Sequence, residues 1–201
     1  MYVGRIVVVG KTDRPFVAYR VSSRSFPNRV ARITPEGVAI QPLDPAEIEK
    51  NPYIAYNCIR VSRGGVVVSN GSHTDPIYRM MEEGASPEAA LHDVLFKMGY
   101  ERDQFNTPRI AGIVTPEKGY LGIVRDNGIE VEGFDLKDKS CKVICTYELN
   151  TIEEIYHPFC ASTALDAAKF VVNGGFFDTL ERPICSAAWL DEFAVYNPHE
   201  K

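Results

Sequence analysis

RIVVVG, at residues 5–10, is a near-continuous apolar run with strand composition, and GVVVS at 65–69 and RIAGIV at 109–114 repeat that character. The turn sequences beside these runs, KTDRP at 11–15, RGG at 63–65 and TPEKG at 115–119, predict hairpins and therefore antiparallel pairing. An antiparallel strand with one wet face alternates apolar and polar residues. Runs that do not alternate therefore predict sheets that are covered on both faces.

Three further segments carry helix signals. A helix is expected from a cap at Thr74 or Asp75 through residue 84, a second from Ser86-Pro87 to Gly99, and a third from a cap at Ser162 to Asn173-Gly174. The order of strands, two helices, strands and one helix predicts an α+β fold built as a four-layer α/β/β/α sandwich. A two-layer α+β fold is the alternative. With no repeat and no linker composition, one domain over residues 1–201 is expected.

The bulk composition narrows the class of function. The 201 residues carry a net charge of -5, which argues against a general nucleic-acid binder. No apolar run approaches the roughly 20 residues that span a bilayer, and Arg5 interrupts the only apolar run near the N-terminus, so neither a membrane segment nor a signal peptide is expected. The odd count of five cysteines favours buried free thiols in a reducing compartment, and hence a cytoplasmic protein.

One segment departs from this acidic balance. Residues 14–32 contain five arginines and no acid, and YRVSSRSFPNR at 19–29 adds three serines and an asparagine. Arg20 and Ser22 share one face of a predicted strand, whereas Phe26-Pro27 should end that strand and leave Arg29 in a loop. Guanidinium forks and hydroxyls at a strand end suit a phosphate or carboxylate. The alternative is a solvated edge strand that is protected by its charge.

Two other polar clusters lie at element ends. GYERDQFNTPR at 99–109 joins a predicted helix to an apolar strand, and SNGSHTDP at 69–76 joins a strand to a helix. Each can equally be a solvated loop or turn chemistry. His73 and Asp75 are imaginable as metal ligands, but the remaining histidines are scattered, so no metal site is expected.

An α/β/β/α sandwich is the fold of the N-terminal nucleophile hydrolases, whose nucleophile is a Cys, Ser or Thr at the first position. Here Met1 precedes Tyr2, and removal of Met1 would expose no nucleophile. If the predicted fold is right, that chemistry is missing.

Taken together, MYVGR at 1–5, YRVSSRSFPNR, NPYIAYNC at 51–58, VVVSNGSHTD at 66–75 and ERDQFNTPRI at 101–110 resemble the archaeal IMP cyclohydrolases. The resemblance covers nearly the whole chain. It implies an N-terminal-nucleophile-type fold without its nucleophile. It also implies ring closure of 5-formamidoimidazole-4-carboxamide ribonucleotide to IMP with loss of water, the last step of purine synthesis, without a cofactor.

Carried over by motif, the resemblance implies that Arg29 and Glu101 are catalytic, with Asp103 as the rival to Glu101. It implies substrate contacts at Tyr56, Asn57, Asn70, Asn106, Thr107 and Arg109, and Ser23 and Arg24 are candidates for the phosphate. The expected partner is a small purine nucleotide; homo-oligomerisation is left open. Two other functions remain alternatives: an amide hydrolase of this fold with an internal nucleophile such as Cys58, and a nucleotide-binding module without chemistry.

Overall fold

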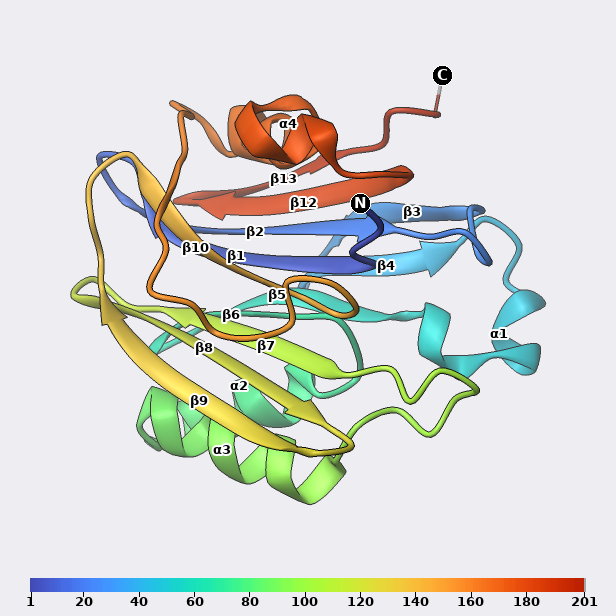
Figure 1. The fold of residues 1–201 in the computed structure, drawn as a ribbon, viewed down its shortest axis with the longest axis horizontal. Coiled ribbons are helices and arrows are strands. Elements are labelled where there is room, and N and C mark those ends of the chain that lie inside the picture. The colour runs from blue at the N-terminus through green and yellow to red at the C-terminus, as the bar shows by residue number, and fades with distance from the viewer. Residues whose placement is uncertain (201) are drawn as a thin grey trace.

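The structure, a computed structural model, describes residues 1–200 apart from the side chains of Lys50 and Pro52, and it contains two antiparallel sheets packed face to face (Figure 1). One sheet has the order β11-β10-β1-β2-β12-β13, formed by β1 (Arg5–Lys11), β2 (Pro15–Ser22), β10 (Ser140–Cys145), β11 (His157–Pro158), β12 (Pro183–Leu190) and β13 (Glu192–Tyr196). The other runs β3 to β9 in chain order, formed by β3 (Arg29–Thr34), β4 (Gly37–Pro42), β5 (Tyr56–Ser62), β6 (Gly65–Ser69), β7 (Arg109–Val114), β8 (Lys118–Arg125) and β9 (Gly128–Asp135).

The helices cover the outer faces of this sandwich. Figure 1 shows α4 above the six-stranded sheet, and α2 and α3 below the seven-stranded sheet. The helical segments are α1 (Glu47–Lys50), α2 (Thr74–Glu82), α3 (Pro87–Met98) and α4 (Ala164–Asn173), with short 3-10 turns η1 (Pro52–Ile54) and η2 (Gly175–Thr179). Within residues 1–200, no helix combines the length and the apolar character that a membrane crossing requires.

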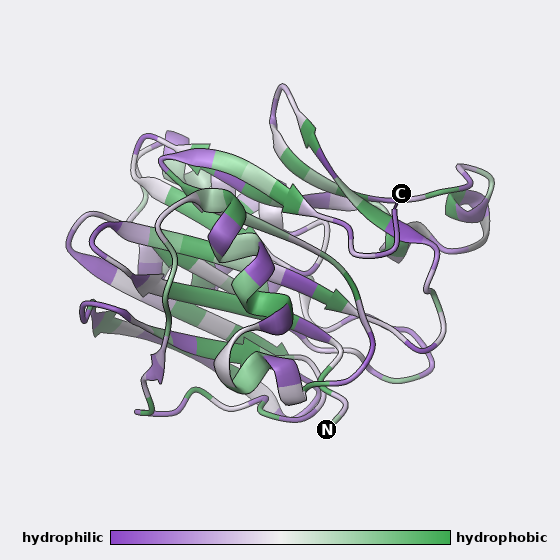
Figure 2. Ribbon diagram, turned by 90° about the horizontal axis from the view of Figure 1, so that it is seen from above, coloured by the Kyte–Doolittle hydropathy of each residue, from purple (hydrophilic) through white to green (hydrophobic). Residues whose placement is uncertain are grey.

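Strand β1 shows why the apolar runs do not alternate. Val7 and Val9 pack into the core between the sheets, whereas Ile6 and Val8 pack into a second core beneath α4. Residues of β6 and β7 divide in the same way between the central core and a third core beneath α2 and α3. Figure 2 shows the resulting pattern, with hydrophobic residues along the strands and hydrophilic ones concentrated in the turns. The α+β prediction is confirmed, and the two-layer alternative is wrong.

Several local predictions need correction. The third helix is capped by Thr163 rather than Ser162, in a capping box with Asp166. The helix from Thr74 has no side-chain cap, whereas Ser86 caps α3 as expected. Cys160 is exposed although a buried thiol was expected; the other four cysteines are buried, and all five are free. β12 and β13 had no counterpart in the predicted elements.

Strand direction decides which side chains meet at one end of the sandwich. Arg5, Arg29, Tyr56 and Arg109 are the first residues of β1, β3, β5 and β7. Because alternate strands of an antiparallel meander begin at the same edge, the last three must lie at one end of their sheet. Arg29 therefore opens β3 and does not lie in a loop, which corrects that prediction.

Candidate active site

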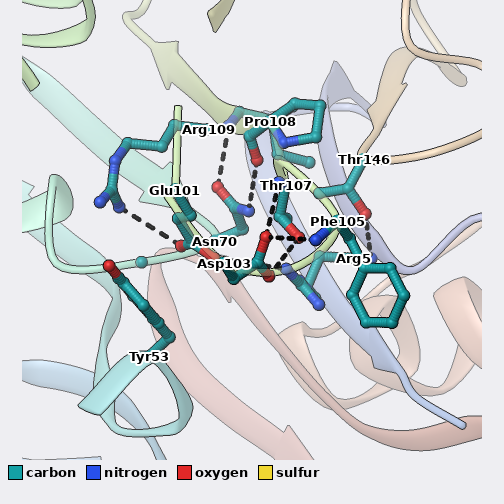
Figure 3. A network of polar contacts seen from close by, with 12 residues as sticks. Arg5, Tyr53, Asn70, Glu101, Asp103, Phe105, Thr107, Pro108, Arg109 and Thr146 are labelled. Carbon is teal, nitrogen blue, oxygen red and sulfur yellow. Dashed lines mark hydrogen bonds and ion pairs between the residues drawn. The ribbon is translucent and has the colours of Figure 1, made fainter. Parts of the chain in front are cut away.

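The centre of this end is the carboxylate of Glu101, which follows α3 and is 2% exposed. Its Oε1 lies 3.3 Å from Nη1 of Arg109, and its Oε2 lies 3.7 Å from Nη2 of Arg5. Figure 3 shows Arg109 and Glu101 pointing toward each other, with Tyr53 beside them. Both ion-pair distances are longer than a good charge-assisted hydrogen bond. The two arginines fix the position of the carboxylate. Because their contacts are long, the carboxylate can still shorten its hydrogen bonds when a ligand binds.

The surroundings of Glu101 favour its protonated form. Burial raises its pKa above the ordinary value, against the opposing charges of Arg5, Arg109 and Arg29, while Asp103 adds to the rise. A carboxylate whose pKa is moved toward neutrality is a stronger base than one in water. The physical setting is that of a general base and not of a simple surface ion pair.

Asp103 has a different environment, although it is only two residues away. Its Oδ1 accepts hydrogen bonds from the backbone N–H groups of Phe105 at 3.1 Å and Thr107 at 2.9 Å, and its Oδ2 accepts one from the Thr107 hydroxyl at 2.7 Å. The backbone N–H of Glu101 donates to the carbonyl of Thr107 at 2.8 Å. Asp103 and Thr107 thus close the loop that presents Glu101 (Figure 3).

A pair of tyrosines lies nearby, between the sheets. The hydroxyls of Tyr19 on β2 and Tyr56 on β5 are 2.8 Å apart. Burial raises the pKa of Tyr56 to about 12, while the positive charges of Arg29 and Arg5 oppose that rise. Arg29 is 4% exposed; its Nε donates to the carbonyl of Phe26 at 3.2 Å, and its Nη2 has no hydrogen-bond partner among the described residues. The Nε side of the guanidinium is thus held by the backbone, while the buried Nη2 is unpaired within residues 1–200.

A cavity of about 610 Å³ is lined by Arg5 and Asp103, two neighbours of Glu101. Aromatic side chains dominate its wall: Tyr2, Phe26, Tyr53, Phe105 and Tyr147. Tyr147 stacks on Tyr2 with ring centroids 5.7 Å apart and meets Phe105 edge to face at 6.5 Å. Arg5 belongs to this wall and also pairs with Glu101, whereas Glu101 and Arg29 are not among the lining residues of this cavity. The volume and the aromatic lining suit a flat heterocycle.

A second cavity of about 1020 Å³ adjoins the first, because Ser23 and Arg24 line both. Arg29 lines this second cavity, together with Arg182 and His199. Ser23 is buried and its hydroxyl accepts from the backbone N–H of Phe26 at 3.0 Å. The two predicted phosphate residues therefore stand on the ridge between the cavities.

The basic segment is mostly neutralised within the chain. Arg24 pairs with Glu181 at 2.9 Å, and Arg14 and Arg32 pair with Asp191 and Glu200. Arg20 is wholly buried and donates to backbone carbonyls at the end of α4 and in the turn that follows it, among them Phe177 at 2.8 Å and Leu180 at 2.6 Å. Of the five arginines, Arg29 is the one with a buried, unpartnered nitrogen in the described part of the chain. Most of the basic charge is thus structural.

Of the eight predicted substrate contacts, only Ser23 and Arg24 line the first cavity. Three of the other six are engaged elsewhere. Asn70 is buried with both amide atoms on the backbone, donating to Pro108 at 3.0 Å and accepting from Ile110 at 2.8 Å. Asn57 donates to Asp75 at 3.0 Å, on the face of β5 opposite Tyr56. Asn106 is exposed, with φ at 49°, and lines a separate cavity with Pro108. Arg109, Tyr56 and Thr107 do lie in or next to the cluster around Glu101.

His73 and Asp75 are separated by their partners. Asp75 pairs with Arg60 at 2.9 Å, whereas Nε2 of His73 lies 2.9 Å from the carbonyl of Ile110. Among residues 1–200, no three His, Cys, Asp or Glu side chains are placed to hold a metal ion together.

The sequence analysis did not predict four residues that belong to the site: Arg5, Tyr19, Tyr53 and Tyr147. Arg5 carried a signal, since it is the one charge before the first apolar run. The tyrosines carried none, because an aromatic residue in or beside a strand usually belongs to a core.

Known proteins of similar sequence place the chain in a family. Residues 2–193 match the family described as "IMP cyclohydrolase-like protein". Proteins named IMP cyclohydrolase from Methanothrix thermoacetophila and Methanocella arvoryzae are each 43% identical over 204 residues, covering 98% of this chain and 100% and 98% of those relatives. One of the same name from Halobacterium salinarum is 43% identical over 188 residues, covering 93% of this chain and 90% of its own. The chain belongs to the family of IMP cyclohydrolase-like proteins.

Proposed function

We propose that this protein is an IMP cyclohydrolase, which closes 5-formamidoimidazole-4-carboxamide ribonucleotide to IMP and releases water. The observation that carries the assignment is the buried Glu101, flanked by Arg109 and by Arg5, which also lines the aromatic-walled cavity. Full-length similarity to proteins of that name supports it. The finer description of the fold as that of an N-terminal nucleophile hydrolase lacking its nucleophile, one domain over residues 1–201 and a cytoplasmic location belong to the same proposal.

The reaction makes few demands on the protein. A carboxamide nitrogen must attack a formyl carbon on the same imidazole ring, so the substrate itself supplies the proximity. The nitrogen must lose a proton, the formyl oxygen must be stabilised as it gains negative charge, and that oxygen must finally leave as water. A base, an oxyanion partner and a proton donor are therefore sufficient.

Glu101 is the base. Burial raises its pKa, so it accepts a proton more readily than an ordinary carboxylate, and the loop closed by Asp103 and Thr107 holds it in place. Asp103 is the weaker candidate because three hydrogen bonds from its own loop already occupy its oxygens.

Arg29 is the oxyanion partner. Its buried Nη2 has no partner within residues 1–200, and its charge acts on both Tyr56 and Glu101. A guanidinium donor that is already fixed before the reaction stabilises a developing oxyanion without reorganisation. Tyr56 is the proton donor for the leaving water, and Tyr19, hydrogen-bonded to it at 2.8 Å, orients that hydroxyl.

The aromatic cavity holds the imidazole and, after closure, the purine ring. Stacking on Tyr147 or Tyr53 suits any flat ring, and Arg5 and Arg109, whose guanidinium carbons lie 5.9 and 6.0 Å from those two ring centroids, add positive charge beside it. The phosphate belongs on the ridge, at Ser23 and Arg24. Arg24 would exchange its pairing with Glu181 for the phosphate.

The alternative hypothesis of an amide hydrolase with Cys58 as its nucleophile has a specific difficulty. Cys58 is wholly buried, and burial raises the pKa of its thiol well above the usual value, so the thiolate nucleophile would be absent at neutral pH. The alternative hypothesis of a nucleotide-binding module involves the same site and differs from the cyclohydrolase proposal only in predicting no turnover.

Measurement of turnover therefore distinguishes a cyclohydrolase from a nucleotide-binding module. The purified protein is incubated with the formamido ribonucleotide in the presence of a strong chelator, and IMP is followed by its absorbance and by chromatography. IMP above the uncatalysed blank supports the proposal, and a metal-free mechanism with it. Binding of the nucleotide without turnover would favour the binding module, and loss of activity that one added divalent ion restores would refute the metal-free mechanism.

A further inference from the structure

His73 is a buried histidine to which the mechanism above gives no role. It stands just before α2 and is 0% exposed. Its Nε2 lies 2.9 Å from the carbonyl oxygen of Ile110. A carbonyl can only accept, so Nε2 carries the hydrogen and Nδ1 of the neutral ring carries a bare lone pair. Burial, reinforced by the charge of Arg109, lowers the pKa of His73 to about 3, so the ring stays neutral where the enzyme would work.

That nitrogen lies close to the carboxylate of Glu101. Nδ1 of His73 is buried and has no hydrogen-bond partner among the described residues. A Cβ atom added at Gly71 would lie 3.2 Å from Nδ1 of His73, 3.1 Å from Oε1 of Glu101 and 3.2 Å from Nη1 of Arg109. Three polar atoms from three different segments thus converge on the space that Gly71 leaves open. We call this space the Gly71 niche.

The chemistry of the three atoms is complementary only when Glu101 is protonated. Arg109 can only donate, the bare Nδ1 can only accept, and an ionised carboxylate can only accept. Once Glu101 holds a proton, its O–H can donate to Nδ1. Nδ1 of His73, a buried acceptor without a donor among the described residues, thus gains a hydrogen-bond donor only when Glu101 is protonated.

We propose that His73 is a positioning residue for ring closure: its Nδ1 accepts a hydrogen bond in the Gly71 niche from Glu101 after that carboxylate has taken the amide proton. Two protons leave the substrate nitrogens and two join the departing oxygen. The first goes from the carboxamide nitrogen to Oε1 of Glu101 and is retained there, while the formyl oxyanion takes one proton from water to become the hydroxyl and a second from Tyr56 as the carbon–oxygen bond breaks. The remaining N–H proton neutralises the hydroxide formed from that water, and the proton of Glu101 then passes through solvent to the Tyr56 phenolate, so no net charge is left. This role rests on the proposed cyclohydrolase function.

His73 should raise the pKa of Glu101. A hydrogen-bond acceptor beside Oε1 stabilises the protonated carboxyl and so raises the pKa of Glu101. It acts in the same direction as burial and against the arginines. The charged groups that face Glu101 are Arg5 from β1, Arg29 from β3, Arg109 from β7 and Asp103 from its own loop. Loss of the acceptor should therefore lower that pKa.

Two substitutions separate this role from a structural one. His73→Gln can keep an N–H donor for the carbonyl of Ile110 and removes the acceptor at the position of Nδ1. His73→Asn keeps an oxygen acceptor near the position of Nδ1 and loses the donor to Ile110. The two variants thus remove opposite halves of the imidazole.

The experiment measures kcat against pH, the melting temperature and IMP affinity for both variants and the wild type. In His73→Gln, kcat should fall about tenfold, the value in rate of one hydrogen bond, and the acid limb of the profile should move to lower pH. His73→Asn should keep the wild-type profile with a lower melting temperature. IMP affinity should change little in either.

A wild-type profile in His73→Gln, or the same shift in both variants, would overturn the proposal. An independent readout is the infrared band of the protonated Glu101 carboxyl, assigned by its absence in Glu101→Gln. This band should titrate at lower pH in His73→Gln even without substrate. If the wild type made no IMP, the proposed function would fail, whereas an unshifted band would defeat the role of His73 alone.

Discussion

The hydroxyl of Tyr19, on β2 of one sheet, lies 2.8 Å from the hydroxyl of Tyr56, on β5 of the other, and the two rings meet edge to face with centroids 6.4 Å apart. This contact joins the two sheets at the end where the arginines converge. Burial raises the pKa of Tyr56 to about 12, so its hydroxyl stays protonated in the working range. A protonated phenol between two guanidinium groups can deliver a proton to a leaving oxygen.

Tyr56→Phe should therefore lower kcat by about 10²-fold, within the range of general acid catalysis, with IMP affinity nearly unchanged. Tyr19→Phe is the matched variant, since it removes only the second hydroxyl of the pair. It should lower kcat by about tenfold or less, as expected for one hydrogen bond. Steady-state kinetics on both variants check this order, and a larger loss in Tyr19→Phe would reverse the two roles.

Glu101→Gln and Asp103→Asn test which carboxylate is the base. Glutamine keeps the shape of Glu101 but accepts no proton at neutral pH, so kcat should fall by about 10²–10⁴-fold. Asp103→Asn weakens the hydrogen bonds that close the loop, so KM should rise and the melting temperature should fall while most of kcat survives. Full turnover by Glu101→Gln beside a dead Asp103→Asn would move the base to Asp103.

Arg29→Ala should lower kcat by about 10²–10³-fold, the effect of losing one oxyanion donor. Arg29→Lys keeps the charge but not the planar fork, so it should retain part of the activity. Added guanidinium ion should restore turnover in the alanine variant, and it should do less for the lysine variant. Absence of any IMP binding in both variants would mean that Arg29 grips the substrate and takes no part in the chemistry.

Gly71→Ala should inactivate without unfolding. The new methyl group would lie 3.1–3.2 Å from the polar atoms of Glu101, Arg109 and His73, which must shift by a few tenths of an ångström. We expect kcat to fall while the melting temperature stays within a few degrees of wild type. Gly64→Ala is the control: this glycine lies in the turn between β5 and β6, and its methyl group would come close only to the flexible Cε end of Met81, with the Met81 backbone oxygen at an ordinary contact distance of 3.8 Å. Equal activity of the two variants would show that the niche does not matter.

Arg20→Met should destabilise the fold and leave the chemistry intact. Burial lowers the pKa of Arg20 to about 10, and its guanidinium holds several backbone carbonyls after α4. Leaving those carbonyls unpaired should cost about 3 kcal/mol or more, which lowers the melting temperature by roughly 6–12 °C. Arg32→Met, which removes an exposed pair with Glu200, should cost far less. Chemical denaturation and kcat of the folded fraction together check both.

Local patterns predicted much of the architecture. RIVVVG lacks alternation because both faces of β1 are buried, Val7 and Val9 against the other sheet and Ile6 and Val8 beneath α4. The sequence could not reveal β12 in the same way. Its Ala187 and Ala188 have little strand preference, and its place between β2 and β13 is decided by packing.

For the candidate site too, some features could be predicted from the sequence and others depend on the tertiary structure. The sequence by itself determined the residue types: motifs singled out Arg29 and Glu101, and turn signals placed the loops. Only the tertiary structure decided which side chains meet. It brought Arg5 and His73 to Glu101, committed Arg20 and Asn70 to backbone groups, and paired Arg24 with Glu181. The physical reason is that charge neutralisation and proton affinity depend on through-space distance and burial, and strand pairing fixes these between residues far apart in the chain.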